Sequence, residues 1–327
     1  MNLLVIGGTL FLGRHVVEHA LAAGHRVTLF NRGRTQAHLF DDVEKIHGDR
    51  DGGLAPLLSR HWDGIIDTCG FVPRVVRQSA ALACDRYVYV STVMAYADLT
   101  RVPVASDPTL PDVDHEEHQR AYGPLKAACE REVLALGERG IVVRPGLIGG
   151  PYDPTGRFTY WPVRFAEGGR VLAPLPREAT AQVIDVRDLA AFLVRLAAQG
   201  PCGIFNGVGR VYSMAGFLES VRDAINPAAE LCWLPPEALE GIAPWRELPL
   251  WLPDPAYAGM TGIDPTPSEA TGLHLRPLAS TARDTLEWAR SLDGEPARQA
   301  DGRYIAGTLS RQEEARRLAA WDLRRNR

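Results

Sequence analysis

The sequence predicts a protein of the α/β class with a doubly wound parallel sheet, and three observations support this. Strand-like and helix-like segments alternate through the first 150 residues, the strands are largely apolar, and a glycine-rich turn joins the first strand to the first helix. Apolar strands that alternate with helices predict parallel pairing between helical layers. The expected strands cover residues 2–6, 26–30, 43–47, 64–68, 86–91 and 141–144, and the expected helices cover residues 12–21, 74–83 and 126–137.

The turn after the first strand has the composition of a dinucleotide-binding site. Glycines let the backbone turn tightly and approach a pyrophosphate, while the free N–H groups at the start of the helix supply positive potential. A second strand, 26–30, completes a unit of about 30 residues. The alternative is a turn that only packs the helix on the strand. The residues expected to bind the cofactor here are Gly7, Gly8, Thr9, Phe11, Leu12 and Gly13.

The end of the second strand indicates which cofactor is preferred. NAD enzymes usually carry Asp or Glu there to accept a hydrogen bond from the ribose 2′-hydroxyl, whereas this chain has Asn31 followed by Arg32 and Arg34. A carboxylate would repel a 2′-phosphate, and guanidinium groups would attract it. The sequence therefore favours NADP(H), with NAD(H) as the alternative if both arginines only face solvent.

Tyr122 and Lys126 are the candidate proton-transfer pair. Their spacing places both side chains on one helix face, where an ammonium beside a phenol is expected to lower the phenol pKa from about 10. Pro124 is tolerated in the first turn, which puts Tyr122 at the start of the helix. Thr92 follows the strand 86–91 and is assigned as the catalytic hydroxyl. The alternative for the Tyr–Lys pair is a solvated helix surface.

Together these motifs resemble those of the extended short-chain dehydrogenase/reductases, the group named NAD-dependent epimerase/dehydratases. The resemblance is carried by Gly7-Gly8-x-x-Phe11-Leu12-Gly13, Ser91-Thr92-x-x-x-Tyr96, Tyr122-x-x-x-Lys126, Arg144-Pro145-Gly146, Asp185-x-x-Asp188 and Gly203-x-Phe-Asn206. It implies a Rossmann domain, Tyr122 as proton donor or acceptor, Lys126 on the nicotinamide ribose, and Thr92 as the third catalytic member. It also implies cofactor contacts from Asp49, Thr68, Cys69, Gly70 and Pro145.

A second, smaller and discontinuous α/β domain is expected to bind the substrate. Residues 1–150 and about 185–210 are assigned to the dinucleotide-binding domain, because 185–198 reads as a helix and 203–206 as a strand. Residues 151–184 and 211–327 are assigned to the substrate domain. Candidate substrate contacts, for which packing is the alternative, are Thr155, Arg157, Tyr160, Trp161, Arg164 and Gln182. Trp245, Trp251 and Trp288 are assigned to the core.

The motifs favour an NAD(P)-dependent oxidoreductase that moves a hydride between nicotinamide and a carbon bearing oxygen, with Tyr122 handling the proton. A sugar or nucleotide-sugar epimerase or dehydratase uses the same step transiently. Leu147 stands where nucleotide-sugar enzymes of this kind often carry Asn, so net reduction is favoured. A non-catalytic nucleotide- or RNA-binding protein of the same fold is the alternative from another class, but a net charge of −4 argues against nucleic acid.

Composition sets the remaining expectations. The 327 residues are 46% hydrophobic, with no apolar run of the roughly 18 residues that span a bilayer, so a cytoplasmic enzyme with a small-molecule substrate and no membrane partner is expected. The five cysteines lack metal-ligand spacing, so no metal site is expected, and the thiols are predicted to be reduced and mostly buried. The family resemblance also implies a homodimer.

Overall fold

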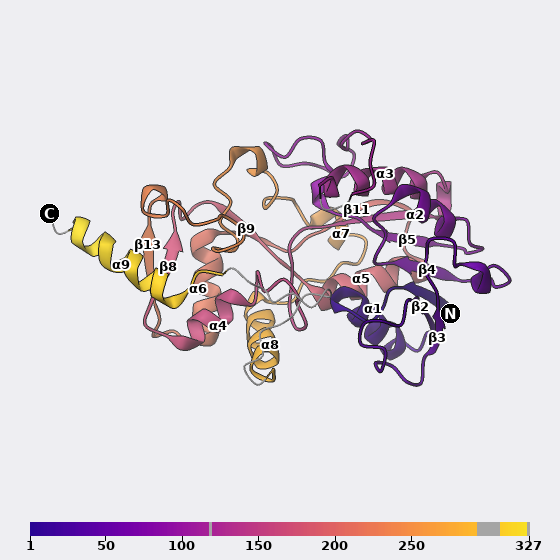
Figure 1. The fold of residues 1–327 in the computed structure, drawn as a ribbon, viewed down its shortest axis with the longest axis horizontal. Helices are drawn as coiled ribbons and strands as arrows, with labels where there is room; N and C mark the ends of the chain where they lie inside the picture. The colour runs from indigo at the N-terminus through magenta and orange to yellow at the C-terminus, as the bar shows by residue number, and fades with distance from the viewer. Residues whose placement is uncertain (118–119, 293–307, 326–327) are drawn as a thin grey trace.

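A seven-stranded parallel sheet forms the centre of the N-terminal region in a computed structural model that describes residues 1–117, 120–292 and 308–325 (Figure 1). Its strand order is β11-β6-β5-β4-β1-β2-β3, and each neighbouring pair is parallel. The strands are β1 (Asn2–Ile6), β2 (Arg26–Asn31), β3 (Glu44–His47), β4 (Gly64–Asp67), β5 (Tyr87–Val90), β6 (Gly140–Pro145) and β11 (Gly203–Gly207). The predicted class and the doubly wound sheet are confirmed, and each strand ends within one residue of its expected bounds.

The chain reverses its direction of winding between β1 and β4. From β1 it runs outward through β2 and β3, and then returns to place β4, β5, β6 and β11 on the other side. In open α/β sheets the connections at such a switch point leave a crevice at the carboxyl ends of the strands. The glycine turn after β1 and the segment after β4 therefore face each other across this crevice.

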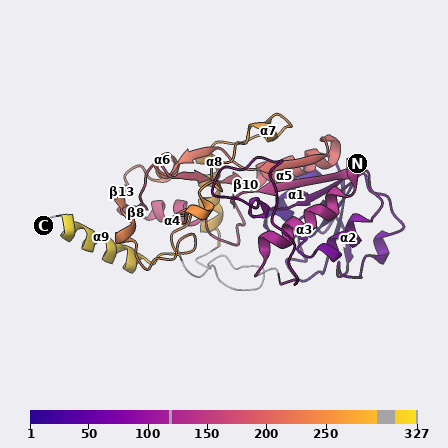
Figure 2. The same ribbon diagram turned by 90° about the horizontal axis from the view of Figure 1, so that it is seen from above.

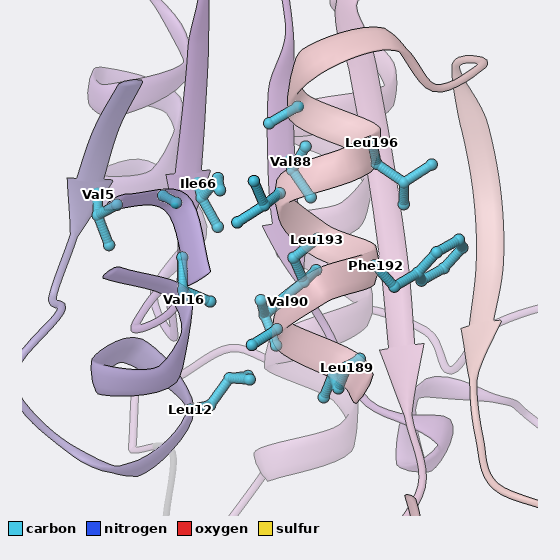
Figure 3. Packing of buried hydrophobic residues seen from close by; sticks show 14 of the residues in the cluster. Val5, Leu12, Val16, Ile66, Val88, Val90, Leu189, Phe192, Leu193 and Leu196 are labelled. Atoms are coloured by element: carbon cyan, nitrogen blue, oxygen red, sulfur yellow. The ribbon is translucent and has the colours of Figure 1, made fainter. Parts of the chain in front are cut away.

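Helices cover both faces of the sheet. These helices are α1 (Phe11–Ala22), α2 (Pro73–Ala80), α3 (Tyr122–Leu134) and α5 (Val186–Gln199). The sheet has an apolar cluster on each of its two faces, because successive side chains of a strand point to opposite faces. Val5 packs with the α1 and α5 residues, as Figure 3 shows, whereas Leu4 packs with Val76 and Val133 of α2 and α3. Gly24 follows α1 with φ +77°, the left-handed conformation expected of the residue that ends it.

A second region lies away from the sheet and ends in α9 (Figures 1 and 2). Its paired strands are β7 (Ile148–Gly149) with β10 (Ile184–Asp185), β8 (Arg170–Pro174) with β13 (Glu230–Leu234), and β9 (Thr180–Gln182) with β12 (Val211–Ser213). Its helices are α4 (Tyr160–Glu167), α6 (Met214–Ile225), α8 (Leu278–Arg290) and α9 (Arg311–Arg325). A separate apolar cluster holds this region together. Of the three tryptophans assigned to the core, Trp251 is buried but Trp245 and Trp288 are half-buried, so that assignment was too broad.

One segment expected in the substrate domain packs instead on the sheet region. The short helix α7 (Thr266–Glu269) contacts β11, and the Ser268 hydroxyl donates to the Asn206 carbonyl at 2.7 Å. Met260 and Ile263 pack against Tyr96. Residues 260–268 therefore pack against the β11 end of the sheet, although the sequence analysis assigned them to the substrate domain.

The cysteines differ from the prediction of mostly buried thiols. Cys84 and Cys129 are buried, Cys69 and Cys232 are half-buried, and Cys202 is exposed. All five are free thiols. Within the described residues, no helix combines the length and apolarity that crossing a membrane requires.

A buried ion pair fixes helix α3 against the sheet. Glu130 of α3 accepts from Arg144 of β6 at 2.6 Å, and the Ser91 hydroxyl also donates to Glu130. Both charged side chains are almost completely buried, and Arg144 additionally donates to the Ala105 carbonyl at 3.1 Å. A buried pair of this kind holds its geometry closely, because moving either partner leaves a charge uncompensated. The helix that carries Tyr122 and Lys126 is therefore held in register with β5 and β6.

Candidate active site

A cavity of about 860 Å³ lies at the carboxyl ends of the strands. It is lined by the glycine turn, by the segments after β2, β3, β4 and β5, and by residues of α3. The predicted cofactor residues that line it are Gly7, Gly8, Thr9, Phe11, Leu12, Gly13, Asn31, Arg32, Arg34, Asp49, Thr68, Cys69, Lys126 and Pro145. Gly70 does not line the cavity, but its carbonyl anchors Lys126. The catalytic candidates Thr92 and Tyr122 lie in the same wall.

The glycine turn fits a pyrophosphate. A Cβ on Gly7, whose φ is +107°, would collide with the Thr68 hydroxyl, and one on Gly13 would lie 2.7 Å from the Gly8 nitrogen. Helix α1 has no side-chain cap and no acidic residue in its first turn, so its free N–H groups keep their positive potential. The backbone is therefore open where a dinucleotide would place its phosphates.

Asn31 holds the turn together. Its Nδ2 donates to the Gly7 carbonyl at 3.0 Å, and its Oδ1 accepts from the Gly33 N–H at 2.9 Å. A carboxylate could accept but could not donate, so the amide is suited to this double role. Arg32 and Arg34 follow on the exposed cavity wall, and no carboxylate in the described part of the chain forms an ion pair with either.

Lys126 is buried and joins two strand ends. Its ammonium donates to the carbonyls of Gly70 at 2.9 Å and Val90 at 2.7 Å, and lies 4.5 Å from the centre of the Phe71 ring. Burial lowers the pKa of Lys126 to about 8. An ammonium has three N–H donors, so one remains for a ligand in the cavity.

Tyr122 differs from the expected electrostatics. The side chain is 40% exposed at the cavity wall, yet the loss of water around its hydroxyl raises the pKa of the phenol, and this outweighs a hydrogen bond with Thr92 and the charge of Arg157, which both lower it. Lys126 is not among the causes, because its ammonium is turned toward the two carbonyls. The expectation of an acidified phenol was therefore wrong for the protein without its cofactor, in which Tyr122 stays protonated at neutral pH.

Four of the candidate substrate contacts are buried away from the cavity, where they bind or pack against other parts of the chain. The Trp161 indole donates to Pro249 at 3.2 Å, Arg164 binds Glu314 at 2.7 Å, and Gln182 donates to Gly209 and Ile263 at 2.7 Å each. The Tyr160 ring packs edge-to-face against Trp161. All four residues are buried in the second region. The structure therefore favours the packing alternative for Tyr160, Trp161, Arg164 and Gln182.

The remaining two candidates belong to a turn beside the active site. Asp153 is fully buried, and its Oδ1 accepts from both the N–H and the hydroxyl of Thr155 at 2.7 Å. The charge of Arg157 reaches both Asp153 and the Tyr122 phenol, while Pro154 lines the cavity. Burial raises the pKa of Asp153 to about 6, against the opposing effects of Thr155 and Arg157.

Three charged groups at or beside the site were missed by the sequence analysis. Arg50 lines the cavity and forms a two-pronged ion pair with Asp67 at 2.8 and 2.6 Å, which holds the pKa of that carboxyl below its usual range although burial opposes this. Asp67 is the last residue of β4, and Arg50 follows β3. Their position at the carboxyl ends of strands could have identified both as candidate site residues from the sequence. Asp153 gave no such signal, because its burial depends on the tertiary fold.

The sheet, the switch point and the open glycine turn define a Rossmann-type fold. Residues 58–207 match the model of the NAD dependent epimerase/dehydratase family. The resemblance drawn from the motifs is confirmed by this match, which covers the central region of the chain.

Two curated relatives are named as reductases. A 2-alkyl-3-oxoalkanoate reductase of Stenotrophomonas maltophilia is 28% identical over 178 residues, which are 47% of this chain and 52% of the relative. The chain thus spans about half the length of that reductase. A putative dihydroflavonol 4-reductase of Synechocystis is 24% identical over 280 residues, 76% of each chain.

Solved structures share the fold at low identity. The UDP-glucuronic acid 4-epimerase of Bacillus cereus, solved with UDP-glucuronic acid and NAD, has a TM-score of 0.63 and 16% identity, over 89% of this chain and 100% of the epimerase. This likeness extends the shared architecture into the second region.

The raised pKa of Asp153 predicts a measurable cost in stability. Its carboxyl binds a proton more readily in the folded than in the unfolded chain, so its contribution to folding is best below pH 3.8 and is lost as the pH rises through about 6. For Asp153→Asn we expect the free energy of unfolding, relative to the unsubstituted protein, to rise by about 3 kcal/mol from pH 3.8 to pH 7.

Urea unfolding across this pH range measures the difference. Asp223→Asn, at an exposed position of α6, controls for the loss of a carboxylate. A constant difference between Asp153→Asn and the unsubstituted protein would contradict the electrostatic account of this turn.

Proposed function

We propose that the protein is an NADP(H)-dependent reductase that converts a carbonyl compound to an alcohol, with Tyr122 as the general acid. The observation that carries the proposal is that Tyr122 and Thr92 share the wall of one cavity with the glycine turn and Lys126. The bound cofactor would supply a hydride. The names of the two curated relatives, both reductases, favour net reduction over transient redox chemistry.

The side chains divide the work in this mechanism. Thr92 and Tyr122 hold the carbonyl oxygen of the substrate, and Tyr122 donates its proton as negative charge develops there. The raised phenol pKa suits an acid, because the group is protonated before the reaction begins. Lys126 keeps one N–H for the nicotinamide ribose and carries positive charge below a pKa of about 8. The hydrogen bond with Thr92 and the charge of Arg157 are the effects that favour the tyrosinate that remains.

Residues on the cavity wall would hold the cofactor. The free N–H groups of α1 would donate hydrogen bonds to the pyrophosphate, with Gly7, Gly8 and Gly13 allowing the close approach. Arg32 and Arg34 bind a 2′-phosphate, for which unpaired guanidinium groups are suited. The other predicted contacts, Asp49, Thr68, Cys69 and Pro145, complete the wall toward the adenosine and nicotinamide ends.

A sugar or nucleotide-sugar epimerase is the second candidate, since the same side chains can serve transient oxidation. The shared architecture with an epimerase keeps it open, but Leu147 supplies no amide and packs against the apolar cluster of the second region. A cytoplasmic location and a homodimer, formed through helices beside Tyr122 and Lys126, are further parts of the proposal.

A substrate screen tests the reaction type. Ketones, 3-oxo acids and UDP-sugars are incubated with NADPH or NADH, and nicotinamide absorbance and product mass are followed together. Loss of NADPH absorbance with a mass gain of two hydrogens is expected. Product of unchanged mass without net cofactor turnover would identify an epimerase instead.

Tyr122→Phe tests the proton donor. We expect kcat to fall by about 10²- to 10⁴-fold, because the phenylalanine ring keeps the packing but has no proton to give. The dissociation constant for NADPH should change little, as measured by fluorescence titration. Tyr212→Phe, in β12 away from the cavity, is the matched control. Turnover retained in Tyr122→Phe would reject the assigned role.

Arg32→Ala and Arg34→Ala test cofactor choice. Each substitution removes a guanidinium from the cavity wall, so the ratio of the NADP to the NAD dissociation constant should shift about tenfold or more against NADP. Arg26→Ala is the control, because Arg26 begins β2 whereas Arg32 and Arg34 follow its other end. If the ratio is the same in all variants, these arginines do not select the cofactor.

A further inference from the structure

The charged residues that line the cavity are gathered at one end of it. The strand order places the ends of β2 and β3 on one side of the cavity and the ends of β5 and β6 on the other. Arg74 of α2 belongs to the first side, because it forms an ion pair with Asp51 at 2.7 Å. The other charged lining residues of that side are Arg32, Arg34, Asp49 and Arg50. The charge that suits a phosphorylated cofactor therefore lies at the β2 and β3 end.

The opposite end of the cavity, which holds Tyr122 and Thr92, has an apolar wall. The Phe71 ring, centred 6.2 Å from the Tyr122 ring, places this wall beside the proton donor. The Ser91 hydroxyl also lines this end but donates to Glu130. The other described lining residues here, which follow β4 and β6 or belong to β7 and the turn after it, are Phe71, Val72, Pro145, Gly146, Ile148 and Pro154.

Lys126 brings a charge to this end, but its ammonium is already bound. It donates to the carbonyls of Gly70 and Val90, and its remaining N–H is assigned to the cofactor. Arg157, whose charge acts on Tyr122, does not line the cavity. A carboxylate or diphosphate beside the reacting carbonyl would lose its water here without gaining a partner among the described lining residues, which is strongly unfavourable.

The segment that follows Thr92 continues the apolar surroundings. The Met94 N–H donates to the Thr92 hydroxyl at 3.2 Å, so this segment is joined directly to the candidate catalytic group. Val93 is buried in an apolar cluster with Met260 and Ile263, and the half-buried Met94 packs against the same cluster. The neighbours of the Thr92 hydroxyl along the chain therefore also favour an apolar ligand.

We propose that the reacting end of the cavity binds an uncharged ketone that carries an alkyl or aryl group next to its carbonyl. This rests on the proposed function and names the substrate class of the same site. Thr92 and Tyr122 hold the oxygen, while Phe71 and Ile148 contact the apolar group. The cofactor hydride goes to the carbonyl carbon and the Tyr122 proton to the oxygen, so the products are a secondary alcohol and oxidised cofactor. Burial of apolar surface drives binding.

A nucleotide-sugar fits this division of the cavity less well. Its diphosphate needs several donors, and the arginines that could supply them, Arg32, Arg34 and Arg74, lie at the cofactor end. An oxo acid meets the same difficulty with a single charge. The two classes are therefore the competing outcomes of the test.

The test first measures binding without turnover. Alkanamides have an uncharged carbonyl that nicotinamide does not reduce, so butanamide, hexanamide and octanamide are titrated into the NADPH-loaded protein by calorimetry, together with octanoate. Affinity should rise about fourfold for each added methylene, with a negative heat-capacity change. Octanoate should bind about tenfold or more weakly than octanamide, because its carboxylate finds no partner. Reduction of 2-pentanone, 2-heptanone and 2-nonanone by NADPH should show the same dependence of kcat/KM on length.

Two substitutions at Ile148 separate polarity from size. Ile148→Val and Ile148→Thr both shorten the side chain and suit a strand, but threonine has a hydroxyl where valine has a methyl group. Octanamide should bind about threefold to tenfold more weakly to Ile148→Thr than to Ile148→Val, whereas butanamide should differ little. Val211→Thr, at an exposed position of β12, makes the same exchange away from the cavity and should change none of these values.

Each outcome decides between the two levels of the proposal. Octanoate that binds as tightly as octanamide, affinity independent of chain length, or equal octanamide affinity in both Ile148 variants would overturn the apolar site. Amide binding as expected in a protein that reduces no ketone would support the apolar site and reject the proposed reductase. Reduction of oxo acids in preference to 2-alkanones would retain the reductase and reject the apolar site. Turnover of a UDP-sugar without net use of cofactor would reject both.

Discussion

The buried ammonium of Lys126 is the interaction on which the candidate site depends. Helix α3 places it beneath the cavity, where it binds carbonyls that follow β4 and end β5. A buried cation without partners would be strongly unfavourable, so the two strand ends and the helix must keep their relative positions. The Glu130–Arg144 pair one turn further along α3 secures the same helix to β6. The positions of Tyr122 and Thr92 follow from this arrangement.

The sequence could predict the structural features that depend on residues close together in the chain. Leu4 and Val5 alternate between two apolar layers, so the strand was recognisable from its residues alone. The glycine turn was equally readable, because Gly7 and Gly13 leave no room for a side chain at their positions. Helix α3 begins where Pro124 allows it to begin.

The parts that could not be predicted have causes far away in the sequence. Arg164 resembled a ligand-binding arginine until Glu314, 150 residues later, was seen to pair with it. The predicted lowering of the Tyr122 pKa failed for a similar reason. Lys126 has the expected spacing from Tyr122, but its ammonium binds two backbone carbonyls that are distant in the sequence. Asp153 looked like an ordinary loop acid, and its burial is a property of the folded chain.

Asn31 joins cofactor recognition to architecture. In NAD enzymes the residue at this place is usually an acid that accepts a hydrogen bond from the ribose 2′-hydroxyl. Here its amide bridges the Gly7 carbonyl and the Gly33 N–H. Introducing an acid would remove the donor half of that bridge and loosen the loop that bears both arginines. Redesign of coenzyme selectivity in this protein must therefore begin at the flanking positions and leave residue 31 alone.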